Sequence, residues 1–139
     1  MKFSELTPDQ WAELAPYLDT AVLPVTGLSG NELPFEATEA LERLRDVLDR
    51  IEQPFKGRIV TYPSCQYADH GAGAEQVEQI CANLKRSGFK YVILTAAFDI
   101  ESWIGKVASA DLIVGTDAQG NPPQSDEVNA AVRNLWLGR

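Results

Sequence analysis

The sequence has 139 residues, of which 45% are hydrophobic and 23% charged, and its formal net charge is −8. These totals are typical of one globular domain over residues 1–139, with a core large enough to need neither a disulfide nor a metal. An acidic surface with scattered Lys and Arg repels phosphate backbones and anionic lipids, so we expect no nucleic-acid binding and no attachment to a membrane surface.

No apolar run approaches the roughly 18 residues that a membrane-spanning helix needs, and no apolar leader precedes the first helical pattern. We therefore expect a cytoplasmic protein without membrane insertion, whose thiols are reduced. Cys65 and Cys81 lack CxxC spacing, and Cys81 falls in an apolar helical stripe.

The first helix is predicted over about residues 8–18. Thr7 and Gln10 have the spacing of a capping box, and Leu6 and Trp11 stand at the two positions of a hydrophobic staple. The chain therefore indicates a well-defined helix start close to its N-terminus.

Four short apolar runs alternate with helical patterns and predict strands that are buried on both faces of a sheet. These runs are Thr20–Val25, Arg58–Tyr62, Tyr91–Ala97 and Ala110–Gly115. Between the first two, residues 35–51 show the three-four spacing of an amphipathic helix. Glu39 with Arg43, and Asp46 with Arg50, are expected to pair on its solvent side.

Three further helices follow in the pattern. They are predicted over residues 74–87, over residues 99–108 with Asp99 as N-cap, and after an N-cap at Ser125 or Asp126. The first helix followed by four βα units predicts an α/β fold, a three-layer α/β/α arrangement with a four-stranded, mostly parallel sheet. By analogy with doubly wound folds, we expect the strand order 2-1-3-4.

Ligands of such sheets bind outside the carboxyl ends of the strands, so the polar residues there are candidates for a site. After the second strand these are Tyr62, Ser64, Cys65, Asp69 and His70, and after the third and fourth strands Asp99 and Asp117. The densest group lies in the loop 64–73, which also holds the one histidine of the sequence.

Cys65 and His70 have the residue types of a nucleophile and its base, with Asp69 next to the histidine. The alternative is that Cys65 is a small buried hydrophobe and His70 a solvated loop residue. The sequence leaves both interpretations open.

Gly71 and Gly73 precede a helix, so their amides are candidates for binding an anion. Gln76 replaces the third glycine of a dinucleotide fingerprint and Glu75 would repel a phosphate, which favours a plain glycine-rich turn. Asp99 and Asp117 have the chemistry of a weak Mg²⁺ site, but helix capping explains them equally. We expect no metal and no cofactor.

Two stretches, Tyr-Leu-Asp-Thr-Ala-Val-Leu-Pro at residues 17–24 and Gly-Arg-Ile-Val-Thr-Tyr-Pro at residues 57–63, resemble the YpiF-like family of uncharacterised bacterial proteins. This resemblance implies a fold and a cytoplasmic setting, and no activity. The N-terminal part, with a strand ending at Val25 and a glycine loop before Leu33-Pro34, is also similar to the start of creatininase-type amidohydrolases. Their metal ligands include a loop histidine that residues 26–32 lack.

Two functions are compatible with these observations. The first is a non-catalytic protein-interaction or regulatory module that binds a protein partner or forms a homodimer, with an exposed apolar patch around Trp103 or Trp136. The second is a small enzyme or ligand-binding sensor that uses the loop 64–73.

Overall fold

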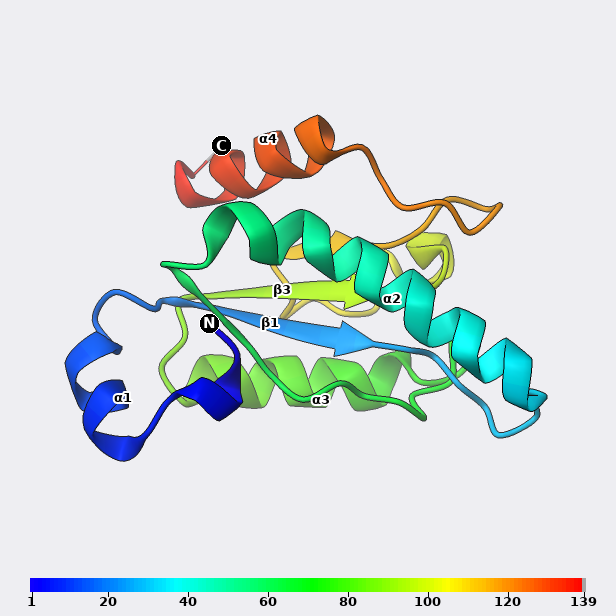
Figure 1. Cartoon of the computed structure of the whole chain (residues 1–139), viewed down its shortest axis with the longest axis horizontal. Helices are drawn as coiled ribbons and strands as arrows, with labels where there is room; N and C mark the ends of the chain where they lie inside the picture. The colour runs from blue at the N-terminus through cyan, green and yellow to red at the C-terminus, as the bar shows by residue number, and fades with distance from the viewer. Residues whose placement is uncertain (139) are drawn as a thin grey trace.

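Four strands form an all-parallel sheet in the computed structural model, which describes residues 1–138 (Figure 1). The sheet has the order β2-β1-β3-β4. The strands are β1 (Thr20–Val25), β2 (Ile59–Thr61), β3 (Tyr91–Ala96) and β4 (Leu112–Val114). The central strands pair along their whole length, from Thr20 opposite Tyr91 to Val25 opposite Ala96. The predicted α/β class and strand order 2-1-3-4 are confirmed.

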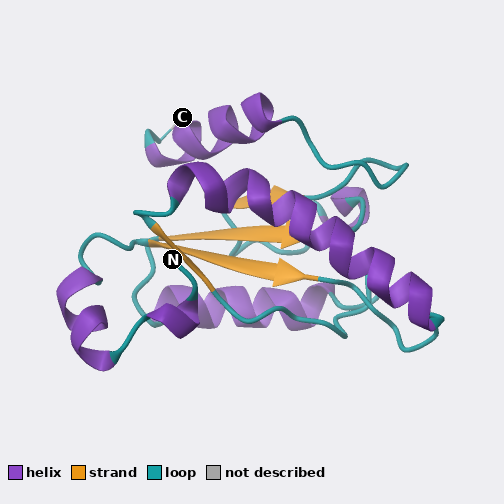
Figure 2. Cartoon of the chain, in the orientation of Figure 1, coloured by secondary structure: helices purple, strands orange, loops and turns teal. Residues whose placement is uncertain are grey.

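Helices cover both faces of this sheet (Figure 2). On one face α2 (Pro34–Phe55) and α4 (Ser125–Trp136) pack against β1 and β3 through Val22 and Ile93. On the other face α3 (Ala74–Arg86) packs against Leu23 and Leu94, the alternate residues of the same strands. Both central strands are therefore buried on both sides, as their continuous apolar runs predict.

Two shorter segments complete the layer of α3. One contains η1 (Phe3–Glu5) and α1 (Pro8–Leu14), and the other contains η2 (Ile100–Trp103). The capping box of α1 is confirmed, since Thr7 Oγ1 accepts a hydrogen bond from Gln10 N at 3.2 Å. Within residues 1–138, no helix is both long and apolar enough to cross a membrane.

The predicted bounds are wrong at several ends. The edge strands β2 and β4 are shorter than expected because each has a single partner strand in the sheet. Helix α1 ends at Leu14 and not near residue 18, since Pro16 lacks the N–H that would continue it. Helix α2 continues past its predicted end to Phe55, whose buried ring meets Trp136 edge-on at 5.0 Å between ring centroids.

The predicted helix over residues 99–108 is wrong. Only the single turn of η2 forms, and Gly105 follows it with a φ of +83°, which ends any helical path. Ile104 is 62% exposed, whereas Trp103 is fully buried. The last helix also begins differently, because its N-cap is Gln124 and not Ser125 or Asp126.

The two charge pairs expected on α2 are also absent from the described residues. Arg43 Nε donates to the carbonyl of Ala97 at 3.2 Å, and Arg50 Nε donates to the carbonyl of Pro123 at 3.0 Å. An exposed ion pair contributes only about 0.2–0.5 kcal/mol, whereas a partly buried carbonyl left without a donor costs about 1–3 kcal/mol. The guanidinium groups of Arg43 and Arg50 therefore donate to loop carbonyls and do not form ion pairs along α2.

Candidate functional site

The crevice between the carboxyl ends of β1 and β3 is where the strand order reverses, and where ligands of related sheets bind. Gly27 follows β1 with a φ of +83°, and Phe98 follows β3. A Cβ placed on Gly27 would lie 2.7 Å from the Phe98 ring and 3.2 Å from the Cβ of His70. The Phe98 ring therefore occupies the space beside Gly27 in this crevice.

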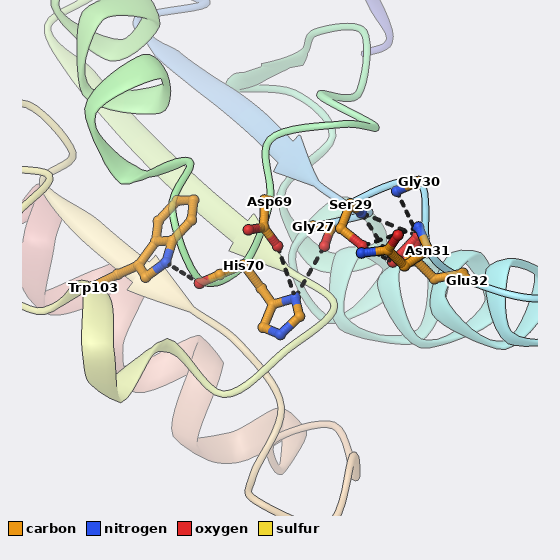
Figure 3. A network of polar contacts seen from close by, with 8 residues as sticks. All are labelled: Gly27, Ser29, Gly30, Asn31, Glu32, Asp69, His70 and Trp103. Carbon is orange, nitrogen blue, oxygen red and sulfur yellow. Dashed lines mark hydrogen bonds and ion pairs between the residues drawn. The ribbon is translucent and has the colours of Figure 1, made fainter.

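His70 lies beside that ring, with 5.9 Å between the two ring centroids. Its Nδ1 is 3.2 Å from the carbonyl oxygen of Gly27 and 3.4 Å from Oδ1 of Asp69 (Figure 3). Both neighbours are acceptors, so this geometry favours the tautomer in which Nδ1 carries a proton and Nε2 is free to accept a hydrogen bond. Trp103 Nε1 donates to the backbone oxygen of His70 at 2.7 Å, which anchors the loop.

The backbone of Cys65 is hydrogen-bonded to the end of β1 and so extends the edge of the sheet. Its N–H donates to the carbonyl of Pro24 at 2.8 Å, and it forms a parallel bridge with Val25. Burial raises the pKa of the Cys65 thiol, which is the opposite of the shift that activates a nucleophile. Among the described residues no hydrogen bond joins Cys65 to His70.

Two of the three amides in the turn from Gly71 to Gly73 form hydrogen bonds within the loop. The N–H groups of Ala72 and Gly73 both donate to the carbonyl of Asp69, at 3.1 and 2.6 Å. A Cβ on Gly73 would lie 2.6 Å from the carbonyl carbon of Ala68, so this glycine is needed for close backbone packing. This geometry favours the plain glycine-rich turn.

Asp99 and Asp117 each satisfy local backbone groups. Asp99 caps η2 by accepting from Glu101 N at 3.1 Å, and Asp117 accepts from Gln119 N and Asn121 N, both at 2.9 Å. The backbone hydrogen bond from Asn121 leads the contacts that lower the pKa of Asp117. Residues 1–138 contain no cluster of three or more His, Cys, Asp or Glu able to hold a metal ion.

The loop after β1 holds an anionic group of its own. The Glu32 carboxylate accepts hydrogen bonds from Ser29 N, Ser29 Oγ and Gly30 N, each at 2.9 Å (Figure 3). These contacts, led by the one from Ser29 N, lower the pKa of Glu32 to about 2. Doubly wound folds bind phosphate through backbone amides at this position. Here the amides of Ser29 and Gly30 instead donate to Glu32. This role of Glu32 was not predicted, although an acid three residues after Ser29, just past a Ser-Gly pair, is a recognisable pattern.

A groove lies away from this crevice, between the first segment and the edge strand β2, and we call it the η1–α1 groove. It has a volume of about 330 Å³ and opens to solvent. Its lining is largely apolar and consists of Phe3, Leu6, Thr7, Pro8, Trp11, Val60 and Tyr62. The rings of Trp11 and Tyr62 both contact the buried Phe89, with centroids 5.9 and 5.6 Å apart.

Tyr62 is thus the predicted ligand-binding residue that lines this groove, and burial raises the pKa of its phenol. Ser64 lines a neighbouring hollow of about 180 Å³ with Phe3 and Pro24. Leu6 and Trp11 were predicted only as a hydrophobic staple, and Phe3 was not predicted to lie at a site. The aromatic and aliphatic residues on either side of the capping box were the one feature of the sequence that could have indicated this groove.

A family model with the description "Protein of unknown function (DUF2487)" matches residues 9–113. No curated protein and no solved structure matches the chain. The comparisons therefore lend no support to the resemblance to creatininase-type amidohydrolases. Because the match covers more than half of the 139 residues, the chain belongs to the DUF2487 family of proteins of unknown function.

Proposed function

We propose that this chain is a non-catalytic protein-interaction module of the bacterial cytoplasm and belongs, within its family, to the YpiF-like group. The observation that carries the proposal is the packing of Phe98 over Gly27, which fills the position where related sheets bind small molecules. A protein whose customary ligand crevice is filled by its own side chain acts most simply through its outer surface.

The polar groups around the crevice support the same proposal. Asp69, Glu32 and Asp117 all bond to nearby groups of this chain, and burial raises the pKa of the Cys65 thiol. A catalytic centre needs a group with a perturbed pKa that faces a substrate-sized space. The pKa values of Glu32 and Asp117 are lowered, and both carboxylates accept hydrogen bonds from backbone amides of their own loops.

The location of the apolar surface differs from the prediction. Trp103 is 1% exposed, so a patch around it is wrong, and Trp136 is half-buried against Phe55 and Arg58. Large apolar side chains are exposed elsewhere, and among them are Phe3, Trp11, Tyr17, Leu33, Phe35 and Tyr67. Aromatic residues are enriched in protein interfaces, which is compatible with a binding role.

The test is an affinity purification of the tagged chain from its own cells, with the wild type compared with Cys65→Ala/His70→Ala. We expect a partner in stoichiometric amount that both forms recover equally, because neither side chain is part of a reaction. A wild-type protein without such a partner, together with a cellular phenotype lost in the double variant, would overturn the proposal.

A second candidate, a small enzyme or ligand sensor using the loop 64–73, is favoured by one observation. Asp69 and Gly27 hold the His70 ring by Nδ1, and this leaves Nε2 oriented as an acceptor. A general base is held in the same way. If His70→Gln abolished the phenotype while the partner was retained, this candidate would replace the first.

A further inference from the structure

We infer that the η1–α1 groove binds a segment of a partner protein in which a large aliphatic or aromatic side chain is flanked by Lys or Arg. This inference rests on the proposed interaction role and names the surface and the chemistry of the partner.

The groove has the size and lining of an anchor pocket. Its volume of about 330 Å³ is at the lower end of the range for ligand pockets, roughly 300–1,000 Å³, and suits one or two large side chains. Phe3 is 47% exposed and Trp11 37% exposed, so each ring offers apolar area that a partner can cover. Binding energy at interfaces is concentrated at such aromatic anchors.

The groove has a fixed shape because its walls come from elements that are held in place. Trp11 and Tyr62 both pack on Phe89, which is 5% exposed. Lys2 pairs with Thr61 as an isolated parallel bridge, which ties the chain next to η1 to the edge of the sheet. A preformed groove binds with less loss of conformational entropy.

The charge around the groove defines the partner. From Phe3 to Leu18 the chain carries Glu5, Asp9 and Glu13 and no Lys or Arg. All three acids are exposed, and within residues 1–138 none of them forms an ion pair. The amino terminus and Lys2 lie near Glu5 and offset part of its potential, but Asp9, Glu13 and the net charge of −8 leave the surface acidic. This surface attracts a basic segment and disfavours an acidic one.

A second copy of this chain is a poor occupant by the same reasoning. Two of its exposed apolar side chains, Leu33 and Phe35, lie next to Glu32 and Glu36 in sequence, and the whole chain carries a net charge of −8. Docking that segment into the groove would bring like charges together, which costs affinity.

The probe is a short synthetic amphipathic peptide with leucine and phenylalanine on one face and lysine on the other. Its control is the same peptide with glutamate in place of lysine. Binding to the full chain is followed by the indole Nε1–H signal of Trp11 in ¹H–¹⁵N spectra, and the three tryptophans are assigned by single substitutions. We expect the lysine peptide to shift the signals of Trp11 and Tyr62, and the glutamate peptide to shift neither.

Two matched pairs of variants separate the apolar contribution from the charged one. Phe3→Ala is compared with Phe35→Ala, which removes a ring from α2 that is 60% exposed, against 47% for Phe3. The triple change Glu5→Gln/Asp9→Asn/Glu13→Gln is compared with Glu39→Gln/Glu42→Gln/Glu75→Gln, which removes the same charge elsewhere. We expect the first variant of each pair to weaken binding, the triple change by roughly three- to a hundredfold, and each control to bind like the wild type.

The inference is overturned if the lysine peptide fails to bind, if both peptides bind alike, or if the shifts map outside the groove. It is also overturned if Trp11 shifts with protein concentration without peptide, which would identify a second copy as occupant. Any of these results leaves the proposed function standing as long as the affinity purification recovers a stoichiometric partner. Loss of that partner would instead refute the function itself.

Discussion

The contact between Gly27 and Phe98 gives the sharpest test of the filled crevice. Gly27→Ala would strain a residue whose φ is +83° and bring its Cβ to 2.7 Å from the ring. We expect roughly 1–2 kcal/mol for the left-handed backbone and roughly 1–3 kcal/mol for overpacking, so about 2–5 kcal/mol of lost stability in total. Gly30→Ala is the matched control, because Gly30 has a φ of +95° and nothing within 4 Å of its Cβ position.

The assay is urea unfolding of the four members of a double-mutant cycle, followed by circular dichroism. Phe98→Ala alone should cost about 2–4 kcal/mol, since the ring is partly buried against Trp103. In the Phe98→Ala background, Gly27→Ala should cost only the roughly 1–2 kcal/mol of the left-handed backbone, because the overpacking is relieved. The coupling energy of the cycle is then about 1–3 kcal/mol. If Gly27→Ala destabilises both backgrounds equally, the ring does not fill the crevice and the reasoning fails.

Three other expectations follow from single contacts. Burial acts to raise the pKa of Asp19, but the hydrogen bonds from Arg58 and Thr20, together with the charge of Arg58 and a backbone hydrogen bond, outweigh it and lower the pKa. Asp19 therefore stabilises the fold above its unfolded pKa. This contribution to the free energy of unfolding should disappear as the pH falls through the folded pKa of Asp19. In the variant Asp19→Asn, the urea midpoint should therefore depend less on pH at acid pH than it does in the wild type. Arg58 makes two bonds to Asp19, at 2.9 and 3.0 Å, with its side chain 38% exposed, so Arg58→Lys should cost roughly 1 kcal/mol in urea unfolding after allowing for screening. Arg45→Lys, in an exposed pair with Asp46, should change stability by no more than about 0.5 kcal/mol, and equal losses at the two sites would contradict this distinction. Because burial raises the pKa of Cys65, iodoacetamide at neutral pH should alkylate it more slowly than free cysteine, by mass spectrometry, and faster alkylation would reveal an activated thiol.

Local patterns predicted the sheet well. β1 has the predicted bounds because its whole run, Thr20–Val25, is buried and each of its residues pairs with β3. The predicted capping box of α1 is also present, since Thr7 and Gln10 lie within one turn of each other. Such features depend on residues that are close in sequence, so periodicity and spacing are sufficient to find them.

The candidate site was only partly predictable. The loop 64–73 was correctly placed at the carboxyl edge of the sheet, but its polar residues bond to their own surroundings, as His70 does to Gly27. The η1–α1 groove was not predicted, because it forms where Trp11 and Tyr62 meet on Phe89. Contacts between residues that are so far apart in sequence cannot be predicted from local patterns.

By itself, the sequence determined that there would be four buried parallel strands with helices on both faces, since hydrophobic periodicity is a property of each short segment. Only the tertiary structure decided where the side chains of Arg43 and Arg50 go, because their carbonyl partners lie 54 and 73 residues away. The same holds for the crevice, where the Phe98 ring occupies space that only a glycine at position 27 leaves free. Local propensity leaves many partners open to each side chain, and long-range packing selects one of them. This selection decides that the crevice at Gly27 is closed and that the η1–α1 groove is open.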